Sequence, residues 1–123
     1  MAQLLKNSTV GGKQIMATSG SILEDYTEKL VNTTGVIDLN LGSVFFRDVT
    51  SNTTFTITNS KVQAHSFTLI LKMRTVRTLT FPASVKWQGG EIPDMTTANK
   101  IYILTFLSID GGTTWFGMSG GEF

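Results

Sequence analysis

The sequence predicts an all-β protein, folded as an antiparallel β-sandwich or jelly roll that carries an extended N-terminal arm. The first observation is composition, because 19 of the 123 residues are threonine, a β-branched residue that favours strands over helices. The second is a repeated alternation of apolar and polar side chains between residues 44 and 118, in short runs separated by turn residues. About seven to nine short strands at this spacing are typical of a sandwich or jelly roll.

The individual strands follow from this alternation. In chain order they are predicted at residues 44–49, 53–58, 66–72, 78–81, 85–87, 100–109 and 113–118. The run 100–109 is apolar on both faces, as expected of a central strand. Pro82 is expected to end the ladder of the strand before it, because proline has no backbone N–H. Asp110-Gly111-Gly112 predicts a hairpin turn in which the glycines adopt positive φ.

The chain is predicted to divide into an arm at residues 1–21 and a β-sandwich domain at residues 22–123. The arm has few large apolar side chains and cannot bury a core of its own, so we expect a neighbouring chain to hold it. Leu4, Leu5 and Val10 are its candidate anchoring residues. The alternative is that the arm packs back on its own domain.

One segment, residues 21–31, fits two structures. Ser21 followed by Glu24 resembles the capping box of a helix. The same residues also alternate in the manner of an edge strand, and we favour a strand because strands follow it.

Charge and composition exclude several classes of partner. The net charge of +1 gives no support for binding to nucleic acid or to anionic lipid. No apolar run approaches the roughly 20 residues needed to span a bilayer, and the first residues lack the apolar centre of a signal peptide. With 41% hydrophobic and only 15% charged residues, part of the surface is expected to be covered by uncharged polar side chains or by a partner chain.

No set of residues predicts catalysis, a metal or a cofactor. The chain has no cysteine and a single histidine, His65, at the start of a strand, where a turn or surface role is expected. Glu24 and Glu28 are the nearest pair of carboxylates, and a solvated face explains them. Four aspartates are expected mostly at turns, where the carboxylate accepts backbone hydrogen bonds: Asp38, Asp48, Asp94 and Asp110. We therefore predict a protein that is not an enzyme.

Trp87, Lys86 and Arg77 are the candidates for contact with a glycan or a protein partner. A tryptophan beside a glycine-rich turn can stack on a sugar ring. For both Trp87 and Trp115, however, packing in the core or in an interface is favoured. The basic residues are more often edge-strand charges that prevent aggregation between sheets.

Residues 65–117 resemble a β-structured module found at the C-terminal ends of phage tail fibres and in other phage virion proteins. The resemblance is carried by Ser66-Phe-Thr-Leu-Ile-Leu71, Arg77-Thr-Leu-Thr-Phe-Pro-Ala-Ser-Val-Lys-Trp87, Ile101-Tyr-Ile-Leu-Thr-Phe106 and Asp110-Gly-Gly-Thr-Thr-Trp115. Leu4-Leu-Lys-Asn-Ser-Thr-Val-Gly-Gly-Lys13 is similar to short openings of fibre proteins, including those of cyanobacterial phages. Family members often have a glycine-rich turn between the first two of these strands, and residues 72–77 have none.

This resemblance implies a structural protein of the virion, made in the host cytoplasm. Its expected partners are two further copies of itself in a homotrimer, other phage virion proteins and host surface glycan. Because the chain has no long shaft, it is expected to be a short tail fibre or a tail-tip or baseplate component. The alternatives are a trimeric capsid decoration (cement) protein and a carbohydrate-binding module.

Overall fold

The computed structural model describes residues 8–10, 13–15 and 28–123 and confirms an all-β fold. Its strands are β1 (Ser8–Val10), β2 (Lys13–Ile15), β3 (Leu30–Asn32), β4 (Val36–Asp38), β5 (Val44–Val49), β6 (Thr53–Thr54), β7 (Thr56–Thr58), β8 (His65–Met73), β9 (Leu79–Thr80), β10 (Val85–Trp87), β11 (Lys100–Ser108) and β12 (Trp115–Glu122). A short 3₁₀ turn, Gln88–Gly90, follows β10.

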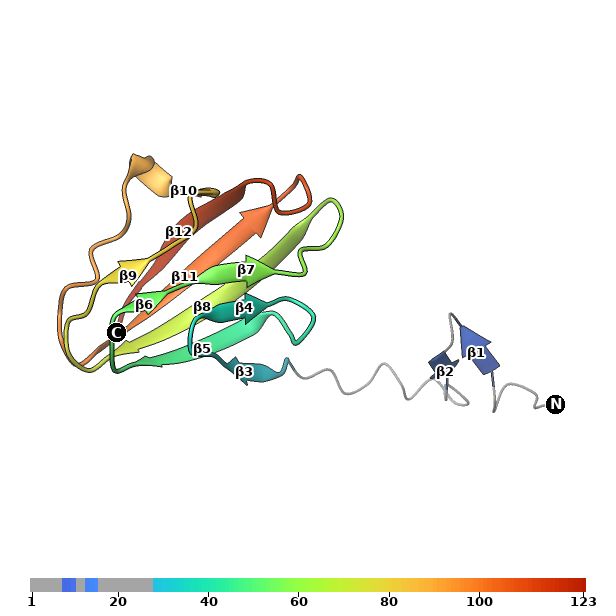
Figure 1. Ribbon diagram of the computed structural model, residues 1–123, viewed down its shortest axis with the longest axis horizontal. Helices are drawn as coiled ribbons and strands as arrows, with labels where there is room; N and C mark the ends of the chain where they lie inside the picture. The colour runs from blue at the N-terminus through green and yellow to red at the C-terminus, as the bar shows by residue number, and fades with distance from the viewer. Residues whose placement is uncertain (1–7, 11–12, 16–27) are drawn as a thin grey trace.

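The strands of the domain lie in two layers. The larger is a mixed six-stranded sheet in the order β10-β12-β11-β8-β5-β3. The strand pairs β4-β7 and β6-β9 lie in front of one face of this sheet (Figure 1). The hairpin β1-β2 forms a separate two-stranded sheet.

The chain passes back and forth between the two layers from β3 to β9, and this makes many of the neighbours parallel. β3, β5 and β8 are consecutive parallel strands of the large sheet, and the crossovers between them are strands of the second layer. β4 pairs with β7, and β6 with β9, in parallel as well. The predicted antiparallel fold is therefore wrong for these pairs and for β10-β12. Only β8-β11-β12 and the hairpin β1-β2 are antiparallel among the described strands.

The core lies between the layers and follows the alternation in the sequence. On β8, Phe67, Leu69 and Leu71 are buried, and their neighbours point to the other face of the sheet. On β11, Leu104 and Phe106 are buried in the same way. β11 has β8 on one side and β12 on the other, which confirms that the strand apolar on both faces is a central one.

The predicted interruptions at Pro82 and at Gly111-Gly112 are also confirmed, whereas the strand predicted at 53–58 is divided into β6 and β7, and the one predicted at 113–118 runs from Trp115 to Glu122. β9 stops at Thr80, just before Pro82, and Gly111 and Gly112 have φ of 72° and 91° in the turn between β11 and β12. Leu30 and Val31 belong to β3, an edge strand, whereas residues 21–27 lie outside the described residues. Residues 74–78, which lack the family's glycines, connect β8 in one layer to β9 in the other.

Candidate functional site

The two layers meet around a cluster of aromatic rings. Phe67 and Phe106 of the large sheet stack with their centroids 4.7 Å apart. In the second layer Phe55 stacks on Phe81 at 5.0 Å. Trp87 packs edge-on against Phe81 and Phe106, at 5.0 and 5.5 Å. These contacts hold the short strands of the second layer on the large sheet.

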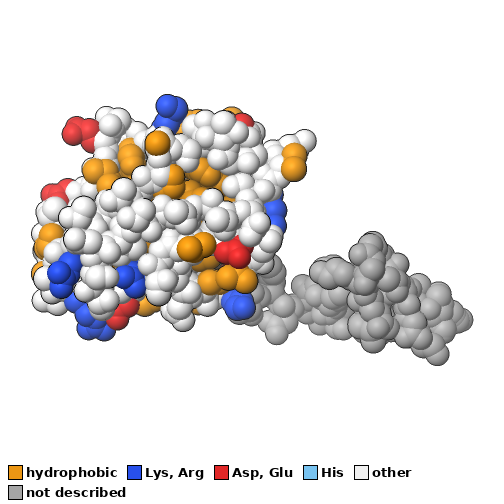
Figure 2. All heavy atoms as spheres, viewed as in Figure 1, with side chains coloured by type: hydrophobic (Ala, Val, Ile, Leu, Met, Phe, Trp, Pro, Cys, Tyr) orange, Lys and Arg blue, Asp and Glu red, His pale blue; other side chains and the backbone are white. Residues whose placement is uncertain are grey.

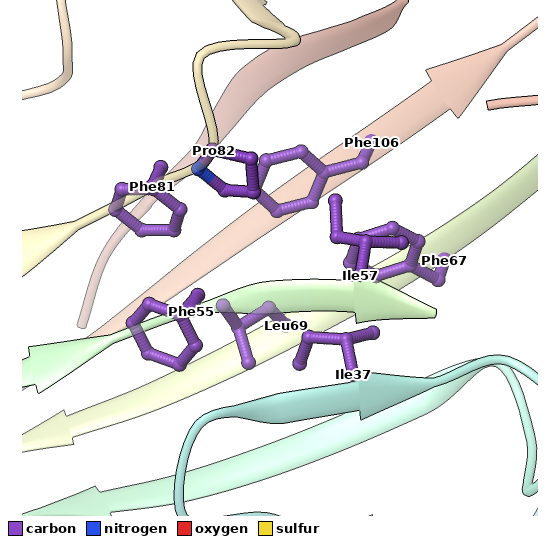
Figure 3. A pocket seen from close by; sticks show the side chains of 8 residues that line it. All are labelled: Ile37, Phe55, Ile57, Phe67, Leu69, Phe81, Pro82 and Phe106. Carbon is purple, nitrogen blue, oxygen red and sulfur yellow. The ribbon is translucent and has the colours of Figure 1, made fainter. Parts of the chain in front are cut away.

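Between β7 and the segment after β9 the second layer is thin, and the core lies directly behind it. Figure 3 shows the apolar residues at this point, which are Ile37, Phe55, Ile57, Phe67, Leu69, Phe81, Pro82 and Phe106. The space between them is too small for a water molecule. This part is packed core, and it forms an apolar floor for what lies in front of it.

A groove of about 350 Å³ lies in front of this floor. It is lined by Thr54, Phe55, Thr56, Ile57, Phe81, Pro82, Ser84, Gly112 and Trp115, none of which is ionisable. The space-filling view of this side shows hydrophobic side chains gathered at the surface above β7 as it is drawn in Figure 1 (Figure 2). The volume lies within the range of sites that bind small ligands.

Trp115 belongs both to the core and to the lining of the groove. Only 1% of its surface is exposed. Its Nε1 lies 3.6 Å from the position that a Cβ on Gly112 would occupy, and both residues line the groove.

The second candidate surface is the outer face of the six-stranded sheet, which points away from the second layer. Phe46, Ile70 and Ile103 lie side by side at its centre, in register on β5, β8 and β11. The large apolar side chains of this outer face are Leu30, Val44, Phe46, Ile70, Ile101, Ile103, Leu107, Phe116 and Met118, all exposed or half-buried. Charged side chains occur only toward its ends, at Asp48, Lys72 and Lys86.

The structure separates the residues that the sequence singled out for glycan or partner contact. Trp87 is half-buried in the aromatic cluster, whereas Lys86, next to it on β10, is exposed on the opposite face of the sheet. Arg77 is exposed in the connection between β8 and β9. Of the predicted anchoring residues, Leu4 and Leu5 lie outside the described residues and Val10 belongs to β1.

Most of the aspartates accept backbone hydrogen bonds at turns, as predicted, and Asp38 does so from the last position of β4. Asp38 accepts a hydrogen bond from the Asn40 N–H at 3.0 Å, and Asp94 accepts one from the Thr96 N–H at 3.1 Å. Asp110 accepts one from the Thr114 N–H at 2.9 Å, which lowers the pKa of its carboxyl. 

Asp48 differs, because it lies within β5 rather than in a turn. The Arg74 Nε donates to its carboxylate at 2.9 Å, and this hydrogen bond lowers the pKa of Asp48. Both side chains are substantially exposed, so the pair contributes little to stability.

His65 is half-buried against Trp115, with the ring centroids 6.4 Å apart. Its Nδ1 is buried without a hydrogen-bond partner. Burial lowers the pKa of its imidazole, and the nearby Lys61 ammonium lowers it further. The His65 ring thus packs on Trp115 at the edge of the core.

Comparison of the chain with family models, with curated proteins and with solved structures finds no match. Among residues 8–10, 13–15 and 28–123, no group of three or more histidine, cysteine, aspartate or glutamate side chains is placed to hold a metal ion. Within the same ranges, the search for a helix long and apolar enough to cross a membrane finds none.

The groove was not predicted from the sequence. Its lining comes from three separate parts of the chain, residues 54–57, 81–84 and 112–115, which the fold brings together. The one local signal is Pro82, which follows an alternating strand and therefore leaves an acceptor on the neighbouring strand unpaired.

Proposed function

We propose that this chain is a structural protein of a bacteriophage particle, which acts by assembly and contact and not by catalysis. The resemblance of residues 65–117 to tail-fibre modules supports the phage assignment. The observation that supports assembly is the outer face of the six-stranded sheet, where nine large apolar side chains lie without a covering layer among the described residues. Apolar patches of this kind mark interaction surfaces.

In this proposal three copies associate through the outer face. In a closed ring of identical subunits every copy of this apolar surface is buried against a neighbour, and three-fold rings are among the symmetries found in homo-oligomers. The charged residues lie toward the ends of the face, so burial of its centre leaves no unpaired charge in the interface. Each subunit is then a β-sandwich, whose second sheet is interrupted at Phe55.

The strength of this association can be tested by one substitution at the centre of the face. Sedimentation velocity should show a trimer for the wild-type chain and a folded monomer for Ile70→Lys, because a buried ammonium at the centre of the interface has no partner. Val62→Lys is the matched control, since Val62 is 86% exposed and lies away from the sheet. A monomeric wild-type protein, or a trimer that survives Ile70→Lys, contradicts the proposed interface.

The favoured component is a short tail fibre or a tail-tip or baseplate protein, attached by the N-terminal arm and in contact with host surface glycan. A capsid decoration protein is the main alternative. Glycan-array binding that is lost in Lys86→Ala, a substitution at an exposed residue beside Trp87, supports the fibre. Absence of glycan binding together with tight capture by empty capsids supports decoration, and labelling of intact particles with gold-conjugated antibody shows the position directly.

A further inference from the structure

The second layer has a strand edge that pairs with no described strand. β7 pairs with β4 alone, through hydrogen bonds such as that from the Thr56 N–H to the Gly35 carbonyl at 3.0 Å. Successive residues of a strand direct their backbone groups to opposite sides. The N–H and C=O of Ile57 therefore point away from β4, toward the groove, and no described strand pairs with them.

Pro82 explains why this edge is open. The neighbouring ladder runs from the Thr53 N–H, which donates to the Thr78 carbonyl at 3.0 Å, to the Phe55 N–H, which donates to the Thr80 carbonyl at 2.8 Å. The next donor in this register is the nitrogen of residue 82, and proline has no N–H. The Phe55 carbonyl is left without a partner from β9, and the two segments separate around the groove.

The groove thus offers what an extended peptide needs. Ile57 supplies a backbone donor and acceptor that no described strand pairs with. The floor is apolar and the lining carries no ionisable side chain. Alternating donors and acceptors along one strand edge suit added backbone better than a sugar or a charged ligand.

The chain itself contains a strand pair that needs such an edge. β1-β2 is a two-stranded hairpin that pairs with no other described strand. Two strands alone are marginally stable in water and gain stability from a third. β1 consists of Ser8, Thr9 and Val10 and is uncharged, whereas β2 carries Lys13. The uncharged β1 is therefore the edge that matches the groove.

We propose that the β1-β2 hairpin of one copy adds to the free edge of β7 in a second copy, with β1 in the groove between β7 and Pro82. The inference rests on the self-association proposed above and names the partner of Val10. Residues 16–29 span at most roughly 46 Å when fully extended, which is long enough to reach a neighbour. Within a single copy the hairpin pairs with neither layer of the domain.

Cysteine trapping tests this directly, because the chain has no cysteine of its own. A Val10→Cys chain is mixed with a Thr56→Cys chain, and interchain disulfides are followed on non-reducing gels under mild oxidation. We expect disulfides at Thr56 to form at least about tenfold faster than with the matched acceptor Val62→Cys, which is 86% exposed and outside the groove. Equal rates at both positions overturn the proposal.

Two further arms separate the remaining outcomes. A chain carrying both Val10→Cys and Thr56→Cys should form no internal disulfide at high dilution, and its formation overturns exchange between copies. If Ile70→Lys abolishes the trimer of an otherwise wild-type chain but no trapping occurs, the sheet interface stands and the hairpin inference fails.

Discussion

At the scale of single residues, Gly112 has the strictest steric requirement in the turn between β11 and β12. Its φ is 91°, and a Cβ added there would lie 2.3 Å from the Ser60 Oγ and 2.5 Å from the Ser60 Cβ. Gly89 also has positive φ, 75°, but an added Cβ would meet nothing within 4 Å. The pair therefore separates backbone strain from steric overlap.

Both glycines can be replaced by alanine, and the free energies of unfolding compared by denaturant titration. Positive φ costs a non-glycine residue roughly 1–3 kcal/mol, and this cost applies to both variants. Gly112→Ala must in addition displace Ser60, so we expect it to lose at least about 1 kcal/mol more than Gly89→Ala. Equal losses in the two variants show that the contact with Ser60 is relieved without cost.

His65 is expected to make the free energy of unfolding depend on pH, at pH values above those at which carboxylates titrate. Burial lowers the pKa of its folded state below the unfolded value of 6.5, so near that pH the unfolded chain binds more protons. Its contribution to stability is complete above pH 6.5 and falls as the pH drops toward the lowered, folded-state pKa. We expect the free energy of unfolding to decrease between pH 7.5 and pH 5.5, and to do so less in His65→Gln. An identical pH dependence in the two proteins contradicts a lowered pKa for His65.

At the scale of elements, the alternation of side chains gave most strands and their buried faces, because a strand with one face in the core must alternate. The direction of pairing could not be obtained in the same way. The alternation of apolar and polar side chains in residues 53–58 is the same whether the neighbouring strand is parallel or antiparallel. The interruption of this run at Phe55, where the strand changes partner from β9 to β4, depends on residues 20 positions earlier and 26 positions later in the chain.

Pro82 is the single residue that controls how far β9 pairs, and it can be tested as such. Pro82→Ala supplies an N–H opposite the unpaired Phe55 carbonyl, so we expect β9 to extend and the amide of residue 82 to be protected from hydrogen exchange. Pro93→Ala, in the connection between β10 and β11, is the control whose new amide should exchange rapidly. An amide at residue 82 that exchanges as fast as the control would show that the ladder ends for a reason other than the missing donor.

At the scale of the whole molecule, the two surfaces proposed for association differ in character. The outer face of the six-stranded sheet is broad and apolar, and it suits a copy of the same domain. The groove on the opposite layer is narrow and carries unpaired backbone groups, and it suits a strand. Since the two surfaces lie on opposite sides of the domain, one can be occupied without blocking the other.

Removal of the N-terminal arm tests whether association of the domains and attachment to the particle depend on different parts of the chain. Removal of residues 1–20 should leave a folded trimer, because the strands of the domain and the outer face lie after this segment. The truncated chain should no longer join particles when it is produced together with the other virion proteins, as measured by its presence in purified particles. Leu4→Asp with Leu5→Asp should reproduce this loss, whereas Lys6→Ala should not, because anchoring is assigned to the apolar side chains. Normal incorporation of the truncated chain rules out the arm as the anchor, and loss of the trimer on truncation assigns the self-association to the hairpin instead of the sheet.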